Sequence, residues 1–272
     1  MTVMKKSKTG IPGFDKLVQG GFPTGANILL CGTPGSAKSI FSLQYAYNGA
    51  MMYGEKSMYV SFEQSKDSIE RQAVQFGWNL AAAEKKGLLH VKNVPVKKID
   101  HTTFPKIIEY VKQHKIKRLV IDSLSTLSIN APMYAAINEL FLKDLIMPDN
   151  IYAPSLSGDY MLKRFIYMLI GELQDLNVTC LLISEIEQGS EAYSRDTVSE
   201  FLCDGIVQMT FESMGGKYSR SLLVRKMRHV KNDEDIHPVE IGKKGLVVHG
   251  LSDSGGELHA ERTGKTKKSR EA

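Results

Sequence analysis

The stretch Gly32-Thr33-Pro34-Gly35-Ser36-Ala37-Lys38-Ser39 decides the fold that this sequence predicts. It follows the apolar run Ile28-Leu-Leu-Cys31 and precedes the amphipathic run Ile40-Phe-Ser-Leu-Gln-Tyr-Ala46, so it joins an expected strand to an expected helix. The backbone amides of such a loop converge at a helix N-terminus, where the helix dipole favours negative charge. The eight residues therefore predict a loop that binds the phosphates of a nucleotide.

Two side chains of this loop carry chemistry. Lys38 is expected to reach the β- and γ-phosphates of ATP, and the Ser39 hydroxyl is expected to ligate Mg²⁺. The loop departs from the pattern G-x-x-x-x-G-K-[ST] because Ala37 stands where the second glycine is usual. A residue that opens a helix can have a negative φ and alanine is small, so we expect nucleotide binding to be retained.

Carboxylates follow three other expected strands. Asp122 ends the buried run Arg118-Leu-Val-Ile and is expected to hold Mg²⁺ through water. Glu63 ends the run Tyr59-Val-Ser-Phe and is expected to orient or deprotonate the attacking water, although it could instead cap a helix that begins near Lys66. The pair Ser184-Glu185 is a candidate sensor of the γ-phosphate.

Outside the loop, short β-branched or apolar runs alternate with longer amphipathic runs, which is typical of the α/β class. We expect a mostly parallel sheet flanked by helices, with antiparallel strands from about residue 205 onward. The expected strands are Asn27–Cys31, Ser57–Ser61, Leu88–Val91, Arg118–Ile121, Thr179–Ile183, Gly205–Phe211, Ser221–Lys226 and Gly245–Val248. The expected helices are Lys38–Met52, Ser68–Phe76, Phe104–Lys115, Tyr134–Leu145, Tyr160–Leu176 and Asp196–Leu202.

The domain organisation predicted from this pattern is one domain over residues 1–250 and a basic, disordered tail over residues 251–272. The stretch between Asp122 and the strand at Thr179 is longer than one crossover helix requires. Residues 129–160 are either a longer crossover packed on the core or an insertion that contacts a protein partner or a neighbouring subunit.

The composition excludes several classes of protein. Hydrophobic residues make up 42% of the 272 residues and charged residues 24%, which is the balance of a globular chain and not of a disordered one. The sequence has no run of about 18 apolar residues, and its basic start lacks the apolar segment of a signal peptide, so we expect a cytoplasmic protein without a membrane span. Three separated cysteines, Cys31, Cys180 and Cys203, are expected to be buried and reduced.

The net charge of +5 belongs to the two ends of the chain. Residues 1–8 contribute +3, and residues 261–272, with five basic and two acidic residues, contribute another +3. The rest of the chain therefore carries −1, which is weak support for a nucleic-acid groove across the domain.

Several segments together resemble the KaiC family of RecA-superfamily ATPases over roughly residues 8–250. They are the opening Lys8-Thr-Gly-Ile-Pro-Gly-Phe-Asp-Lys-Leu17 with Gly20-Gly-Phe-Pro-Thr-Gly25, then Asn48-Gly49, Tyr59-Val-Ser-Phe-Glu63, Phe76-Gly-Trp-Asn-Leu80, Ser184-Glu-Ile186, Glu200-Phe-Leu-Cys-Asp-Gly-Ile-Val207 and Lys226-Met-Arg228.

This resemblance implies a RecA-like fold and a ring, usually a homohexamer, with ATP between subunits. It implies that Glu63 is the general base, while the second of the family's two adjacent glutamates is Gln64 here and could alter the hydrolysis rate. It also implies that Lys226 and Arg228 reach the γ-phosphate bound to the adjacent subunit, where a cation stabilises the developing charge.

Two departures limit what the resemblance implies. The phosphorylated Ser-Thr pair of the clock protein's second domain is replaced by Glu200-Phe201, so a clock-type autokinase is not expected. The Gly-Thr-x-His run that often follows Lys-x-Arg is replaced by His229-Val-Lys-Asn232, so the resemblance does not define the details of the subunit contact.

The sequence favours a regulatory or signalling ATPase with slow, Mg²⁺-dependent hydrolysis. Two alternatives stay open. One is a RecA- or helicase-like ATPase that acts on nucleic acid, although no recognisable DNA-binding module is present. The other is an assembly platform that binds ATP with little hydrolysis, which the departures at Ala37 and Gln64 motivate.

Overall fold

The computed structural model describes residues 4–127, 158–186, 190, 192–214 and 217–250. Within these residues nine strands form one sheet, in the order β11-β10-β9-β8-β3-β7-β6-β4-β5. The strands are β3 (Asn27–Gly32), β4 (Ser57–Ser61), β5 (Leu89–Asn93), β6 (Arg118–Asp122), β7 (Thr179–Glu185), β8 (Gly205–Met214), β9 (Lys217–Met227), β10 (His237–Gly242) and β11 (Gly245–Val248).

The sheet has a parallel part and an antiparallel part. Strands β8, β3, β7, β6, β4 and β5 pair in parallel, whereas β9, β10 and β11 add to β8 in antiparallel order. This confirms the predicted α/β class with C-terminal antiparallel strands. A separate two-stranded sheet, of β1 (Lys6–Ser7) and β2 (Phe22–Pro23), precedes the loop.

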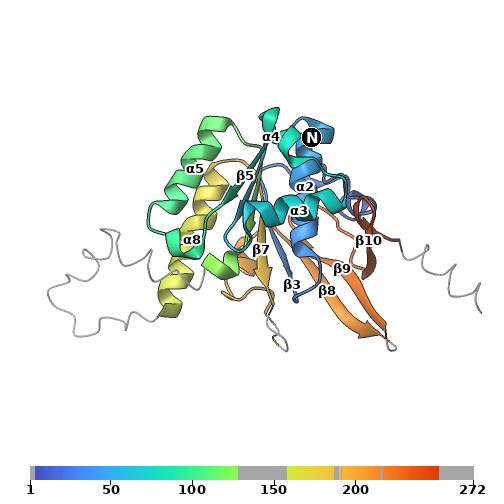
Figure 1. Cartoon of the computed structure of the whole chain (residues 1–272). Coiled ribbons are helices and arrows are strands. Elements are labelled where there is room, and N and C mark those ends of the chain that lie inside the picture. Colours follow the sequence, from blue (N-terminus) through green and yellow to red (C-terminus); the bar gives the residue numbers. More distant parts are fainter. Residues whose placement is uncertain (1–3, 128–157, 187–189, 191, 215–216, 251–272) are drawn as a thin grey trace, which may run out of the picture.

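Helices cover both faces of the sheet (Figure 1). Successive residues of β3 point to opposite faces, so Leu30 packs in the core on the α2 side and Leu29 packs in the core on the α5 and α8 side. Strands buried on both faces read as continuous apolar runs, as the sequence does here. The helices are α1 (Phe14–Leu17), α2 (Lys38–Tyr53), α3 (Lys66–Gln75), α4 (Leu80–Lys85), α5 (Thr103–His114), α8 (Gly158–Asp175) and α9 (Ser199–Leu202), with a 3₁₀ turn at Val96–Lys98.

The predicted elements match except at short or unusual segments. Strand β10 is not among the predicted strands, because Pro238 inside its run removes a ladder donor and argues against a strand. Pro238 is tolerated because it lies in a strand near the sheet margin, where it pairs with Ser221 of β9. Helix α4 is not among the predicted helices either, because its 6 residues are too few for a clear helical period.

Some predictions fall on residues that the structure does not describe. The helix predicted over 134–145 and most of the insertion predicted over 129–160 lie outside the described residues, as does the tail over 251–272. In the described part of the chain, no helix is both long enough and apolar enough to cross a membrane. All three cysteines are buried and free, and burial raises the pKa of the Cys31 thiol to about 12.

Candidate active site

The phosphate loop connects the end of β3 to the start of α2, as predicted. The Lys38 ammonium is buried against this loop and donates hydrogen bonds to the carbonyl oxygens of Gly32, at 2.8 Å, and Thr33, at 3.0 Å. Burial lowers the pKa of Lys38, and the nearby carboxylates of Glu185 and Asp122 act against that shift. The loop therefore already holds its cation at the place where phosphates would enter.

Ala37 does not have the negative φ that we expected. Its φ is 77° and its ψ is 26°, so it occupies the left-handed region directly before α2. Glycine adopts this conformation without penalty, whereas the Cβ of alanine clashes with the backbone. The backbone at this position therefore has the left-handed conformation that suits the usual glycine, and Ala37 adopts it under strain.

The two glycines of the loop are required by close approach to β8. A Cβ on Gly32 would lie 1.9 Å from the carbonyl oxygen of Met209, which no side chain can do. Gly35 has φ 80°, and a Cβ there would lie 3.1 Å from the ring of Phe211. The loop is thus packed directly against the strand that begins the antiparallel part of the sheet.

Asp122 lies at the end of β6, beside the loop, as predicted. Its carboxylate accepts a 2.5 Å hydrogen bond from the phenol of Tyr59 and a further hydrogen bond from Ser39. Burial raises the pKa of Asp122 to about 6 and Glu63 contributes in the same direction, whereas the bonds from Tyr59 and Ser39 act against the shift. The two residues predicted to hold Mg²⁺ are therefore in contact.

Glu63 lies just beyond β4 and does not cap the next helix. The hydroxyl of Ser65 is the N-cap of α3 and accepts from the amide of Ser68, so the capping alternative is wrong. The Glu63 carboxylate instead accepts hydrogen bonds from the hydroxyls of Ser123 and, at 2.7 Å, Thr126, both located just after Asp122. This arrangement joins the candidate base to the candidate metal-binding strand.

These groups line one pocket of about 360 Å³. Glu185 at the end of β7 is among them, because β7 pairs with β3 so that Glu185 lies opposite Gly32. The lining also includes residues that were not predicted from the sequence, among them Arg220 of β9 and Ile241 of β10. Arg220 donates to the carbonyl of Gly35 at 2.9 Å. Arg220 lies just before the strand predicted at Ser221–Lys226, and only the pairing of β9 with β8 brings it to the loop.

Lys226 and Arg228 are not in this pocket. Lys226 pairs with Ile206 near the start of β8, whereas Gly32 pairs with Met209 further along the same strand. The Lys226 ammonium donates to the carbonyl of Cys203 at 2.7 Å, and Arg228 forms an ion pair with Asp204 at 3.3 Å. Both cations therefore lie beside the start of β8, whereas the phosphate loop adjoins the middle of that strand.

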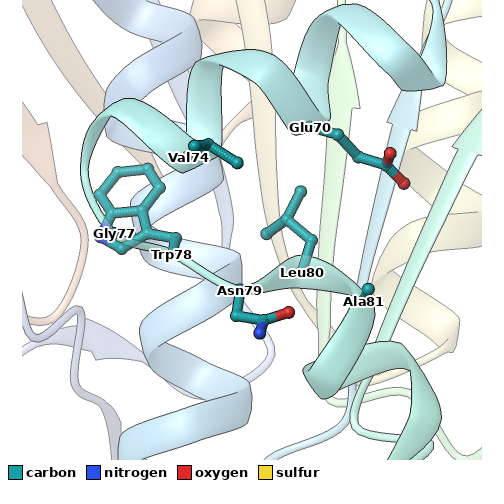
Figure 2. Close-up of a pocket in the computed structure, with 7 residues that line it drawn as sticks. All are labelled: Glu70, Val74, Gly77, Trp78, Asn79, Leu80 and Ala81. Carbon is teal, nitrogen blue, oxygen red and sulfur yellow. The ribbon is translucent and has the colours of Figure 1, made fainter.

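A second pocket, of about 350 Å³, lies between α3 and α4 and has a different character (Figure 2). Figure 2 shows Val74 and Leu80 across the space between the two helices, with the indole of Trp78 at one end and Glu70 at the other. The pocket contains no basic side chain among its lining residues, so it is unsuited to a nucleotide.

The loop pocket suits a metal that is held in part by its substrate. Among the described residues no group of three or more His, Cys, Asp or Glu side chains could hold a metal ion by itself. Mg²⁺ in nucleotide sites usually takes one or two protein oxygens, several waters and the phosphates. The adjoining Ser39 hydroxyl and Asp122 carboxylate fit that donor set.

A parallel sheet with a phosphate loop at the end of β3 and a carboxylate at the end of β6 defines a RecA-like, phosphate-loop class of protein. Comparison with known proteins gives the family. The family model described as "ATPase: KaiC" matches residues 7–147 and 133–253. The chain belongs to the KaiC family of ATPases, a family that binds nucleotides.

Similar proteins extend over nearly the whole chain. A UPF0273 protein of Thermotoga maritima is 31% identical over 247 residues, covering 91% of this chain and 97% of the relative. A UPF0273 protein of Pyrococcus furiosus is 30% identical over 263 residues, covering 91% and 95%. The circadian clock oscillator protein KaiC of Prochlorococcus marinus is 29% identical over 257 residues, but these cover only 46% of that protein.

A solved structure supports the same relationship. The crystal structure of a KaiC-like protein from Pyrococcus horikoshii superposes with a TM-score of 0.75 at 29% identity, covering 91% of this chain and all of that chain.

Proposed function

We propose that this chain binds ATP with Mg²⁺ and hydrolyses it slowly, as a KaiC-like regulatory or signalling ATPase that assembles as a ring with ATP between subunits. The observation that carries the proposal is the convergence of three groups on one pocket: Lys38, Asp122 and Glu63. The membership of the chain in an ATPase family supports the same conclusion.

Each group has a role that its surroundings suit. Lys38 would exchange the carbonyls of Gly32 and Thr33 for phosphate oxygens, because an ammonium binds the anion more strongly than neutral carbonyls. Ser39 and Asp122 would hold Mg²⁺, which would neutralise charge on the phosphate oxygens. Glu63 would accept a proton from the attacking water. The oxygen of that water would bond to the γ-phosphorus while the bond between the γ-phosphorus and the β-phosphate oxygen of the departing ADP breaks.

The positions of Lys226 and Arg228 support a site shared between two copies. Along β8 the backbone of Lys226 lies about 10 Å from the level of Gly32, because three residues of strand separate Ile206 from Met209, and Arg228 lies further away, beside Asp204. Their side chains bond to backbone and carboxylate oxygens near the start of β8 and not to the phosphate loop of their own chain. A neighbouring chain in a ring could receive them, as cations supplied in trans do in other phosphate-loop enzymes.

The rate of phosphate release from Mg-ATP, measured for the full chain and for its variants, tests hydrolysis. We expect Lys38→Ala and Glu63→Gln each to lower the rate by at least about 100-fold, since each removes a group acting in the transition state. Lys86→Ala and Glu109→Gln change exposed residues, the first directly after α4 and the second on α5, and should leave the rate unchanged. A rate unaffected by Glu63→Gln would overturn the assignment of the base.

The same assay separates the alternative functions. A rate stimulated many-fold by single-stranded DNA, with salt-sensitive binding, would favour a nucleic-acid-dependent ATPase. Tight ATP binding without hydrolysis would favour an assembly platform. In that case, deletion of residues 129–160 should abolish partner binding and leave nucleotide affinity intact.

A further inference from the structure

The Glu63 carboxylate is held by two hydroxyl groups from the segment that follows β6. Ser123 and Thr126 both donate to Oε1, the latter at 2.7 Å, so neither of these bonds occupies Oε2. The amide of Thr126 also donates to Ser123 Oγ at 3.3 Å, so Ser123 caps the helical turn of residues 124–127 that carries Thr126. Glu63 itself is exposed, so without these bonds its side chain would be free to rotate.

We propose that Thr126 is a positioning residue for hydrolysis: its hydroxyl, together with that of Ser123, fixes the Glu63 carboxylate so that Oε2 faces the attacking water. The inference rests on the proposed function, because it concerns the residue proposed there as the base. A carboxylate fixed through one oxygen presents the other in a constant direction. Catalytic groups lose much of their effect when they are misplaced by even about 1 Å.

Thr126 is the better of the two hydroxyls to test. Ser123 is buried and follows Asp122 directly, so its replacement would also disturb the candidate metal site. Thr126 is half-buried, four residues from Asp122, and Thr126→Val keeps the shape of the side chain while removing its donor. Thr126→Ser keeps the donor and removes only a methyl group.

The experiment compares kcat and KM for Mg-ATP among these variants. Thr126→Val should lower kcat by about 10-fold and leave KM within about twofold, because the proton transfer and not the binding is affected. Thr126→Ser should restore most of the rate. Thr102→Val is a matched control, because Thr102 also donates to a carboxylate, that of Asp100, at the start of α5. It should leave both constants unchanged.

Repeating the Thr126→Val change in the Glu63→Gln variant shows whether Thr126 acts through Glu63. In Glu63→Gln, the added change Thr126→Val should cause no further loss, since residues acting as one unit are not additive. Affinity for a non-hydrolysable ATP analogue, measured by calorimetry, shows that each variant is folded. If Thr126→Val did not fold, Thr126→Ala would take its place.

The outcomes separate this inference from the proposed function. An unmodified chain that did not hydrolyse ATP would overturn both. Normal hydrolysis that requires Glu63 but is unchanged or faster in Thr126→Val would overturn the positioning role alone. A higher KM at unchanged kcat, or a loss that persists in Glu63→Gln, would do the same.

Discussion

The phenol of Tyr59 donates a 2.5 Å hydrogen bond to Oδ2 of Asp122, a residue 63 positions further along the chain. The bond crosses between the paired strands β4 and β6, and both side chains are buried. Burying an ionised carboxylate raises the free energy of the folded chain unless the carboxylate accepts hydrogen bonds. The bond from Tyr59 favours the ionised form and so helps to keep the candidate metal ligand charged. This pair leads to two predictions about pH.

The first concerns the pH profile of catalysis. Burial raises the pKa of Asp122 to about 6, so below that pH the carboxyl is protonated and a poor ligand for Mg²⁺. We expect kcat/KM, which reports groups of the free enzyme, to fall below about pH 6. Tyr59→Phe removes a bond that lowers the pKa of Asp122, so the acidic limb should move upward, by about one pH unit.

Tyr45→Phe is the control for that measurement. Tyr45 is equally buried, but its hydroxyl contacts Ser7 and not the candidate site. Its replacement should leave the profile in place. An acidic limb that did not respond to Tyr59→Phe would show that the fall in activity reports another group.

The second prediction concerns stability. The folded pKa of Asp122, about 6, lies above the value of 3.8 for an unperturbed aspartate, so the folded chain binds more protons between these pH values. The contribution of Asp122 to stability is therefore lost as the pH rises through this window. Asp122→Asn should stabilise the nucleotide-free chain at pH 7 by about 1–3 kcal/mol and have little effect at pH 4.

Urea unfolding of the parent chain and Asp122→Asn at both pH values measures this difference. The same variant should lose Mg²⁺-dependent hydrolysis, because an amide is a weaker ligand than a carboxylate. A variant that is less stable than the parent at pH 7 would contradict the sign of the pKa shift.

A third prediction follows from the left-handed conformation of Ala37. Glycine at this position removes the clash of the Cβ, so Ala37→Gly should stabilise the chain by about 0.5–1 kcal/mol despite the greater freedom of glycine in the unfolded state. Ala81→Gly is a matched control of opposite sign, since Ala81 lies in helix α4, where glycine costs about 1 kcal/mol. Chemical denaturation measures the free energy of unfolding of both variants. An Ala37→Gly variant that is less stable than the parent would contradict the proposal that Ala37 is strained.

Much of the site could be predicted from the sequence because its residues follow strands. The carboxyl ends of β3, β4, β6 and β7 meet at one edge of the sheet, so Lys38, Glu63, Asp122 and Glu185 had to come together once the strands were recognised as parallel. The φ of Ala37 could not be foreseen from residue type, because alanine rarely adopts that conformation.

The remaining parts depend on pairings with no local signature. Arg220 reaches the loop because β9 folds back along β8, and the register of an antiparallel pair is set by packing and not by the residue itself. Thr126 binds Glu63 across 63 positions of sequence. Neither residue stands in a motif, so only the assembled fold identifies them.

The proposed ring requires that each ATP site is shared, with Lys38 from one copy and the cations Lys226 and Arg228 from the next. Mixing two inactive variants tests it most directly. Lys38→Ala lacks a working phosphate loop but keeps its cations, and Lys226→Ala has the reverse defect. If sites form between copies, an equal mixture of the two should recover about a quarter of the parent rate, because one random contact in four joins two intact parts.

The measurement is phosphate release with Mg-ATP after the two variants are combined and allowed to exchange subunits. Each variant alone is the control and should be nearly inactive. Recovery towards a quarter of the parent rate is the result expected of a shared site. A mixture as inactive as its components, or a Lys226→Ala variant with full activity by itself, would contradict it.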